Sequence, residues 1–521
     1  MPPFPGGSVC VSFGPGKVEG PIGVSDLSAN SVTRSQAVLV SAHAGRLVLF
    51  VAITSLLGRL LAPADFGFVA LVSSLYVVAV EVLDMGTTAV ATREIAARPA
   101  RERDTLTALL ALRRLLSGVL FAAVLGLAFS NYVVQDDQRM VLVAAACGLF
   151  LQHLYAYQLV FQVRQAYGQA ISLGLAGQLG FLLASTAALK FQAGGAVIAL
   201  LVVAREIVQV LGSRWVAVRM LGYRLRASWL HAGIRPLLKA GWMIGVAGVG
   251  YKLATYSGGF ILWKIAAPEA LASFSAAQRL LVPLADMAWL YVTPLIAAMS
   301  VAVSHSAAAF RTQLEGYAKL LLGMSSLAAV AGYFVAPFLL RLLYGEQYAS
   351  GTWSAVGAFR WLALGNVFAL VTPVLVVGEM TQGRVRALMF TSIACLGLNV
   401  AGNAWAIPMY GAEGAAMVLF LCEAFVFLVL IARCAARRDA RLNGAWAAYL
   451  APAALLGVAL SLLADSPVLQ LAAACAWAPA ALFVIMQLPA QRACRASLAT
   501  VSAQWRPEPG PLGPSTPGDC R

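Results

Sequence analysis

The sequence predicts an all-α polytopic membrane protein, with about 14 transmembrane helices forming two six-helix lobes around a central cavity plus two C-terminal helices. Sixty per cent of its 521 residues are hydrophobic and only 11% are charged. A soluble fold of this composition would leave a very large apolar surface. Apolar runs of about 20 residues, long enough to cross a hydrocarbon core, also recur along the chain.

The apolar runs fall into two sets of six, followed by a final pair. The first set lies near 38–61, 67–90, 107–129, 140–162, 169–189 and 195–213. The second set lies near 240–265, 271–300, 320–343, 353–377, 387–406 and 414–432, and the last pair near 445–463 and 468–487. We therefore expect an N-terminal lobe over 38–213, a C-terminal lobe over 240–435, and two additional transmembrane helices over 445–487.

Three polar stretches separate and flank these parts. Residues 1–37 are rich in Gly, Pro, Ser and Val, and residues 488–521 end in a Pro-rich run, so both are predicted to be disordered tails. Residues 214–239 carry six basic side chains and no acid, which is typical of a cytoplasmic linker. In this helix scheme, almost all loop Lys and Arg residues fall on one side. The positive-inside rule then predicts that both termini lie in the cytoplasm.

The two sets begin with similar turns. Leu61–Phe66 reads LAPADF and Ala266–Leu271 reads AAPEAL, so an Ala-Pro turn recurs six helices later on the same predicted side. A parallel repeat of this kind is common in transporters with a midplane site. The alternative is that two short membrane turns have converged.

Several function classes find no support in the sequence. The net charge of +15 follows from the basic cytoplasmic loops and does not require nucleic acid. No phosphate-binding GxxxxGK[ST] loop, HExxH motif or Gly-x-Ser-x-Gly turn occurs. The eight cysteines show no metal-ligand spacing. We expect neither an enzyme nor a bound cofactor or metal.

Ionisable side chains inside the predicted spans are candidates for function, because burying charge in a membrane is costly. His43 and Arg46 share a face of the first span, and Glu81 and Asp84 lie three residues apart in the second. The alternative role is structural: Arg46 and one of these acids would pair and hold two helices together. Arg113 and Arg114, one turn into the third span from its cytoplasmic end, are placed where they can extend to the membrane surface.

The seventh and eighth spans carry further charges. Lys252 lies in mid-span among glycines at three- and four-residue intervals, a face that either packs on another helix or lines a cavity. Arg279 and Asp286 lie seven residues apart, on either side of Pro283, which permits a bend. The pairs and single charges of other spans, Arg205–Glu206, Arg360 and Glu423, are interpreted first as interhelical contacts.

These cations suggest one anion site. Arg46, Lys252 and Arg279 come from early helices of the two lobes, and a cavity that they line would suit a phosphate, which guanidinium groups bind in bidentate fashion. His43, Glu81, Asp84 and Asp286 remain candidates for ion coupling or helix pairing.

Four motifs resemble those of the polysaccharide-export (Wzx-type) flippases of the multidrug/oligosaccharidyl-lipid/polysaccharide (MOP) superfamily. LGRLLAPADFG at 57–67 is similar to their LGRxLGPxDFG pattern, and DMG at 84–86 with REIA at 93–96 to their DLG and REIA. LYGEQY at 343–348 and IPMYGAEGAA at 407–416 resemble later elements in the same order. The departures are Ala62, where the family has glycine, and Ala272 with Ser273 after the second turn.

The resemblance implies a function. Flippases of this family move undecaprenyl-pyrophosphate-linked oligosaccharide repeat units to the outer leaflet by alternating access, coupled to H⁺ or Na⁺. The expected partners are the lipid-linked oligosaccharide, membrane lipid and the polysaccharide polymerase machinery, with no nucleic acid.

Three alternatives remain at this point. A peptidoglycan-precursor flippase and a cation-coupled drug exporter belong to the same superfamily, and the drug exporter would depend more on Glu81, Asp84 and Asp286 than on the arginines. A membrane polysaccharide polymerase or ligase would need a large outer loop, and the predicted outer loops are short.

Overall fold

The computed structural model describes residues 29–493, except 131–132, 134, 165, 226–228, 352, 438, 441–443, 464–465 and 490. Nothing is described of the side chains of residues 29–44, nor of most side chains between 286 and 305. The chain forms two compact units, Met1–Leu47 and Val48–Arg521. The packing given below is that of the second unit. The tails predicted at 1–37 and 488–521 lie mostly outside the described residues.

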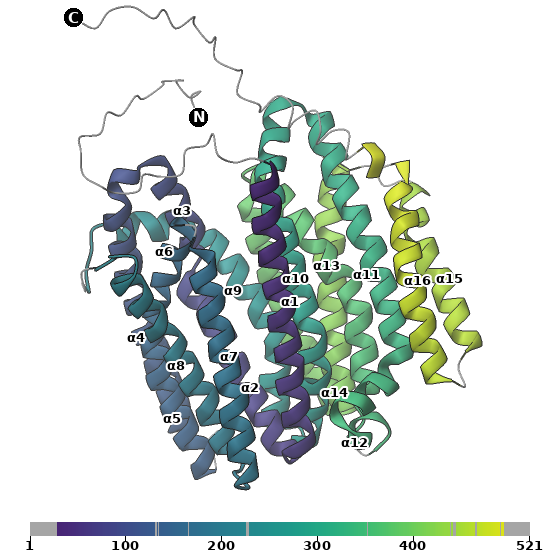
Figure 1. Ribbon diagram of the computed structural model, residues 1–521, viewed down its shortest axis with the longest axis horizontal. Helices are drawn as coiled ribbons and strands as arrows, with labels where there is room; N and C mark the ends of the chain where they lie inside the picture. Colours follow the sequence, from purple (N-terminus) through teal and green to yellow (C-terminus); the bar gives the residue numbers. More distant parts are fainter. Residues whose placement is uncertain are drawn as a thin grey trace, which may run out of the picture. The chain divides into compact units, whose positions relative to one another are not determined.

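The N-terminal set of helices follows the predicted ranges, with two breaks inside them (Figure 1). The second predicted span is divided between two helices, and the fourth passes through a short 3₁₀ segment. The elements are α1 (Ala29–Leu60), α2 (Pro63–Asp84), α3 (Thr87–Ala97), η2 (Pro99–Arg101), α4 (Glu102–Ala128), α5 (Asp136–Leu151), η3 (Gln152–Ala156), α6 (Tyr157–Val163), α7 (Tyr167–Lys190) and α8 (Gly195–Arg219).

The C-terminal set also follows the prediction, although its helices are longer than expected. The elements are α9 (Ile234–Ile265), α10 (Pro268–His305), α11 (Ala307–Tyr344), α12 (Glu346–Ala349), α13 (Val356–Thr381), α14 (Val385–Ala436), η4 (Gly444–Trp446), α15 (Ala447–Leu462) and α16 (Pro467–Gln487). Because α8 continues to Arg219 and α9 starts at Ile234, the non-helical stretch between the two sets is shorter than the predicted linker 214–239.

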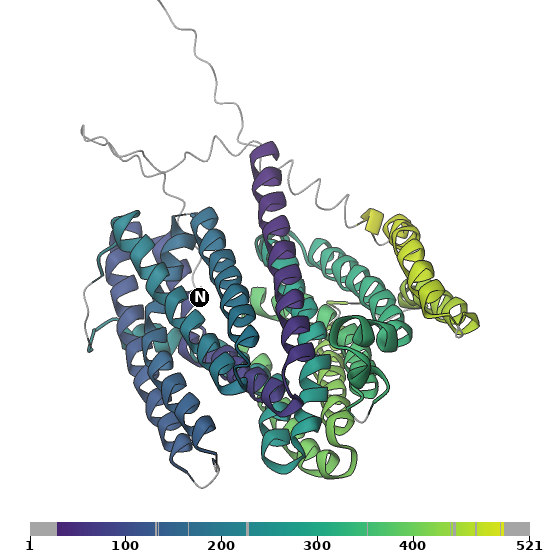
Figure 2. The ribbon, with the colours of Figure 1, turned by 60° about the horizontal axis from the view of Figure 1, so that its bottom comes forward.

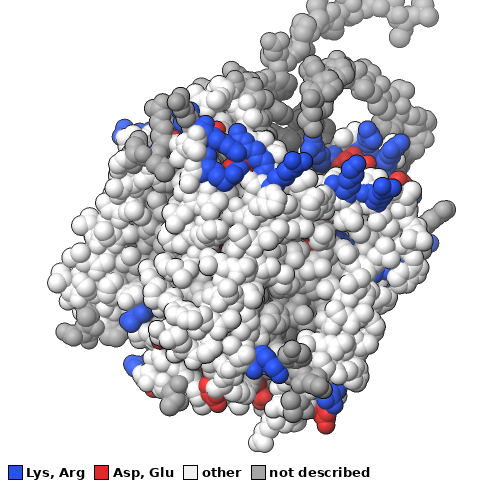
Figure 3. Space-filling view, turned by 180° about the vertical axis from the view of Figure 1, so that it is seen from behind, with Lys and Arg blue, Asp and Glu red and all other residues white. Residues whose placement is uncertain are grey.

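The surface of the helices matches a membrane environment. Among the described residues, nine helices are long and apolar enough to cross a membrane. Figure 3 shows Lys and Arg gathered near one end of the helices, above a broad surface with few charges. The chain is a multi-pass, all-helical membrane protein.

The two Ala-Pro turns share one backbone conformation. Ala62 has φ −59° and ψ 147°, and Ala267 has φ −63° and ψ 147°. In each turn the next residue is a proline in the first turn of a helix, where its fixed φ suits the helix and no backbone N–H is needed. Pro63 and Pro268 therefore start α2 and α10 for the same reason. We call the end of the helices at these turns the Pro63 end, and the end at the α2–α3 break the Gly86 end.

The break between α2 and α3 depends on glycine. Met85 and Gly86 both have positive φ, 42° and 68°. A Cβ at Gly86 would lie 2.6 Å from the carbonyl oxygen of Gly241 and 2.8 Å from the backbone nitrogen of Gly245, both on α9. The glycine face of α9 thus packs against the α2–α3 break. Of the two roles expected for this face, helix packing or cavity lining, the part at Gly241 and Gly245 has the first.

A second break divides α14. Gly411 has φ 53° and ψ −126°, outside the helical region, and Pro408 lies within the preceding turn. The two predicted spans near 387–406 and 414–432 are the two halves of this helix. Gly411 follows Tyr410 in the IPMYGAEGAA motif, so that motif is the point where the direction of the chain changes.

The helices pack mainly with others of their own set. In the N-terminal set, α5 packs on α4 and α8, and α8 also packs on α7. In the C-terminal set, α14 packs on α9 and α13, and α13 also packs on α10 and α11. α2 makes contacts with α9 and α10, and these join the two sets. α15 and α16 pack on α11 (Figures 1 and 2).

Candidate functional site

Two motifs that are far apart in the sequence meet at the Pro63 end. Arg59, near the end of α1, donates from Nε to the carbonyl oxygen of Leu343 at 3.0 Å and from a terminal nitrogen to that of Leu342. Ser55 also donates to the Leu343 carbonyl. The last carbonyls of a helix lack intrahelical partners, so Arg59 satisfies groups that α11 leaves open at its C-terminus. The LGR segment therefore caps the LYG segment.

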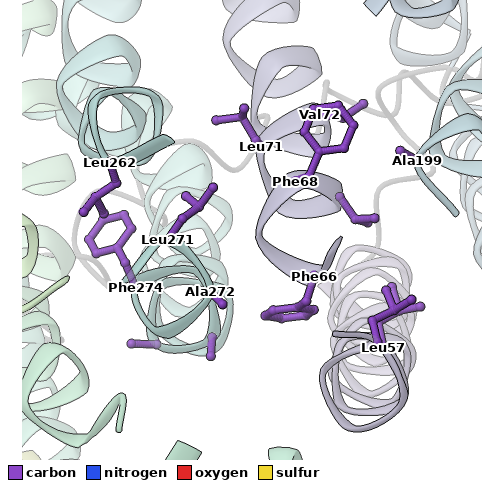
Figure 4. Close-up of a cluster of buried hydrophobic side chains, with 14 of the residues drawn as sticks. Leu57, Phe66, Phe68, Leu71, Val72, Ala199, Leu262, Leu271, Ala272 and Phe274 are labelled. Carbon is purple, nitrogen blue, oxygen red and sulfur yellow. The ribbon is translucent and has the colours of Figure 1, made fainter. Parts of the chain in front are cut away.

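Aromatic rings fill the space behind this cap. The centroid of Phe66, in the PADFG segment, lies 5.8 Å from Tyr344 and 6.1 Å from Tyr348, and the two tyrosines are 5.5 Å apart. All three residues are buried. Figure 4 shows Phe66 and Leu57 in one buried cluster with Leu271 and other residues of the C-terminal set. This cluster joins the two sets of helices at the Pro63 end.

Arg279 lies between the sets. A terminal nitrogen donates to the carbonyl oxygen of Val69 at 3.3 Å and to Oγ of Ser73 at 3.1 Å, and the guanidinium stands 5.6 Å from the Phe66 ring centroid. Tyr344, Tyr256 and Arg205 of α8 also interact with it electrostatically. A buried cation held by neutral groups retains the capacity to bind an anion.

Lys252 belongs to a different site, inside the C-terminal set. A pocket with an empty volume of about 480 Å³ lies between α9, α10, α13 and α14. Its polar lining includes Tyr251, Lys252, Asn366 and Glu423. The Tyr251 hydroxyl lies 2.9 and 3.0 Å from the two carboxylate oxygens of Glu423, within donating distance of both. The ammonium group of Lys252 interacts electrostatically with the same carboxylate.

A row of buried polar side chains continues beside this pocket. Asn403 donates to Oδ1 of Asn399 at 2.7 Å, and Ser257 donates to the same oxygen. Asn399 in turn donates to Sγ of Cys422 at 3.5 Å. The row connects α9 with both halves of α14. Among the described residues, Oδ1 of Asn403 is left without a hydrogen-bond partner.

The two acids of the second span, Glu81 and Asp84, contact neighbouring helices. Asp84, the last residue of α2, forms an ion pair with Arg113 of α4 at 2.7 Å and accepts a hydrogen bond from Thr88. Arg113 is 2% exposed, so the expectation that it extends to the membrane surface is wrong. The Glu81 carboxylate lies against Gly248 of α9, close enough to leave no room for a side chain there.

Arg46, His43 and Asp286 are not placed with the others. Arg46 is partly exposed on α1 and belongs to the unit Met1–Leu47, which is separate from the unit that contains Lys252 and Arg279. The side chains of His43 and Asp286 lie outside the described residues. The joint anion site of Arg46, Lys252 and Arg279 stays a prediction. Lys252 interacts with Glu423 of α14, whereas Arg279 donates hydrogen bonds to α2.

Sequence reasoning gave too little weight to two residues. Arg113 was placed at the surface because it lies near a helix end, yet the break after Asp84 brings a carboxylate to it. Glu423 was interpreted as a helix contact, although a lone acid in a long apolar run is a signal of function in a membrane. Its tyrosine and lysine neighbours are adjacent residues of α9 and could not be assigned to it without the fold.

Comparisons with known proteins identify the family and the fold. Residues 32–302 match the model of a family described as "Polysaccharide biosynthesis protein". A comparison with curated protein sequences gave no match. Among solved structures, the lipid II flippase MurJ in an inward closed conformation is similar with a TM-score of 0.70 and 10% identity, covering 87% of this chain and 99% of that one.

Two multidrug transporters are similar at a lower level. An inward-facing multidrug resistance MATE family transporter of the MOP superfamily has a TM-score of 0.51 and 15% identity, covering 75% of this chain and 96% of its own. A variant of the Vibrio cholerae MATE transporter VcmN has a TM-score of 0.51 and 16% identity, covering 78% and 99%.

The class of protein follows from the two helix sets, the contacts that join them and these likenesses: the chain has the flippase and transporter fold of the MOP superfamily. Its family model covers more than half of the chain. The protein belongs to the polysaccharide biosynthesis protein family.

Proposed function

We propose that the protein is a flippase that moves undecaprenyl-pyrophosphate-linked oligosaccharide repeat units across the bacterial inner membrane by alternating access. Membership of the polysaccharide biosynthesis family supports the substrate class. The pyrophosphate is the part of this substrate that hydrocarbon rejects most strongly, so the protein must offer it cationic groups. The likeness to a lipid II flippase supports a lipid-linked cargo.

The observation that carries the proposal is the position of Arg279. It lies at the contact between α10 and α2, where the two sets meet, and its partners are a carbonyl, a hydroxyl and an aromatic ring. A phosphate group carries full negative charge and can accept two parallel N–H bonds from one guanidinium, which neither the carbonyl nor the hydroxyl offers. As the two sets of helices separate, an arriving pyrophosphate would therefore replace the carbonyl and hydroxyl groups as the partner of Arg279.

The orientation is part of the proposal. With both termini in the cytoplasm, the basic Gly86 end faces the cytoplasm and the Pro63 end faces outward. The Arg59 cap and the Phe66–Tyr344–Tyr348 cluster then close the outer side in the present structure. Single cysteines at exposed Ala100 and Gly383 are expected to react with a membrane-impermeant thiol reagent only after the membrane is opened, whereas a cysteine at exposed Lys190 reacts in intact cells.

The test is deletion of the gene, followed by analysis of surface polysaccharide and lipid-linked intermediates. Full repeat units are expected to accumulate on the inner leaflet. Arg279→Ala should fail to restore export, Arg279→Lys should restore part of it, and Arg360→Ala is the matched control, because Arg360 stacks 4.7 Å from the Tyr333 ring within the C-terminal set. Normal export by Arg279→Ala, made at the wild-type level, would disprove the anion role.

The same deletion separates two other candidates. The likeness to the lipid II flippase favours a peptidoglycan precursor as the second candidate, since that cargo has the same pyrophosphate chemistry. Accumulation of that precursor, with normal polysaccharide intermediates, would select it. Sensitivity to drugs with neither intermediate accumulating would select a drug exporter.

A further inference from the structure

The pocket in the C-terminal set has an ionisable centre that the proposed cargo does not use. Glu423 of α14 is 6% exposed. It is the one carboxylate among the described residues that line the pocket. Tyr251 lies within hydrogen-bonding distance of both of its oxygens, and Lys252, the next residue of α9, interacts with it electrostatically. Two consecutive residues of one helix therefore stabilise the ionised form of a carboxylate on another.

The other groups that face Glu423 are mostly neutral. Cys422 precedes it on α14, and Cys395 contacts Cys422 from the first half of that helix. Asn366 is the polar contribution of α13. From α10 come the apolar residues Leu281, Val282 and Ala285. Asp286 follows Ala285 in the sequence, and its side chain lies outside the described residues.

Such a carboxylate can be ionised or protonated, and the two forms need different surroundings. The ionised form needs both partners on α9, because an unpaired charge inside a membrane costs several kcal/mol at least. The protonated form needs neither and is tolerated in an apolar pocket.

The same helix carries the contact at the Gly86 end. A Cβ at Gly245 of α9 would lie 2.5 Å from the Cα of Met85, and one at Gly241 would lie 3.0 Å from the Met85 carbonyl oxygen. Six residues separate Gly245 from Tyr251, a rise of about 9 Å along the helix. Tyr251 and Lys252 therefore lie less than two helical turns from the contact between α9 and the α2–α3 break. If their contacts with α14 change, α9 can shift at that contact.

We infer that Glu423 is a proton-exchange site whose protonation state controls the packing of α9 against the α2–α3 break. When Glu423 takes up one proton, the hydrogen bonds from Tyr251 and the attraction of Lys252 weaken, and α9 is free to move relative to α14. When the proton leaves to the other side of the membrane, the contacts re-form. One proton enters and one leaves per cycle. As a coupling step, the inference rests on the proposed function.

The first test does not need the cargo. A single cysteine replacing Ile244, which lies against Gly86, is introduced into a chain without other cysteines, and its reaction with a thiol reagent is followed against pH. A cysteine replacing exposed Ala100 corrects for thiol ionisation. The corrected rate is expected to depend on pH, to lose that dependence with Glu423→Gln and to keep it with Glu423→Asp.

Matched carboxylate variants decide which acid is responsible. Glu315→Gln, beside Lys319 on α11, should keep the pH dependence, since Gln still accepts from Lys319. Asp286→Asn should keep it as well. A pH dependence that persists in Glu423→Gln, or that disappears in Asp286→Asn alone, overturns the inference. Each variant is first checked by size-exclusion chromatography, where it should elute as a single peak at the position of the wild type.

The second test uses translocation in proteoliposomes. For one proton per cargo, a pH difference of one unit drives a distribution ratio of up to about tenfold. Glu423→Gln should reduce this ratio to about one while cargo still equilibrates. An equal response in wild type and Glu423→Gln contradicts the inference. Absence of any translocation by the wild type contradicts the proposed function and leaves the cysteine experiment to decide on Glu423.

Discussion

The ring of Tyr344 occupies the space above Gly58. A Cβ on Gly58 would overlap Cδ1 of that ring and lie 2.8 Å from Cε1. Gly58 belongs to the LGR segment of α1 and Tyr344 to the LYG segment of α11, so two distant motifs are fitted to one another at the Pro63 end. Glycine in the first motif is required by the aromatic ring in the second.

Gly58→Val should therefore destabilise the protein. Overfilling a packed site costs about 1–3 kcal/mol, and the backbone of α1 cannot move away without losing the Arg59 cap. Thermal unfolding in detergent measures the effect, with Gly118→Val as the control because a Cβ there meets nothing within 4 Å. Tyr344→Ala in the Gly58→Val chain should recover part of the loss, and failure to do so would show that the ring is not the obstacle.

Arg59→Ala should loosen the end of α11. The substitution leaves the Leu342 and Leu343 carbonyls without this donor, at a cost of about 1 kcal/mol for a typical hydrogen bond. Hydrogen exchange of a peptide covering residues 340–350 should become faster, while exchange in α16 stays unchanged. Arg384→Ala, which removes an ion pair with Asp439 and leaves the α11–α12 turn untouched, is the comparison. If hydrogen exchange is unchanged in Arg59→Ala, the Arg59 cap does not stabilise the end of α11.

Asp84→Asn should lower the stability of the protein more than Gly58→Val or Arg59→Ala. It leaves Arg113 buried without its counter-charge, and breaking a buried pair typically costs about 3–5 kcal/mol. The expected result is poor accumulation and a lower melting temperature in detergent. The double variant Asp84→Leu with Arg113→Met should be closer to wild type, because no unpaired charge remains. Equal stability of Asp84→Asn and wild type would show that Arg113 is satisfied without Asp84.

The turn after α11 should respond to acid. Hydrogen bonds from Ser350 and Arg341 hold the pKa of the Glu346 carboxyl below its usual value. Because the folded-state pKa is lowered, the stabilising contribution is present above the usual pKa of about 4.3 and is lost as the pH falls through the lowered value. Exchange rates in the α11–α12 turn, corrected for intrinsic pH dependence, should rise over that range. Glu346→Gln should show the faster exchange already at neutral pH.

The helices themselves were predictable from the sequence, because apolar runs of membrane length and prolines at helix starts are local signals. Pro63 and Pro268 show the limit of this: the prediction placed both in turns, and each is the first residue of a helix expected to start near 67 or 271. The α2–α3 break was missed, since Gly86 lies in an apolar run and its positive φ matters only once Gly241 and Gly245 of α9 pack against it.

The site was harder to predict for the same reason. Arg279 was recognised as a charge inside a span, but its neighbours Val69 and Ser73 are more than 200 residues away in the sequence. Glu423 was assigned a structural role because its partners, Tyr251 and Lys252, belong to another helix. Pairing of distant side chains depends on helix packing, which periodicity alone does not encode.

The central claim is tested most directly by translocation of purified undecaprenyl-pyrophosphate-linked oligosaccharide in proteoliposomes that contain the purified protein. Transfer from the outer to the inner leaflet, measured by protection of the glycan from an added glycosidase, should occur with the wild type and with Arg360→Ala, weaken with Arg279→Lys and stop with Arg279→Ala. Protection no greater than in protein-free vesicles, or an equal rate in Arg279→Ala, would contradict the account.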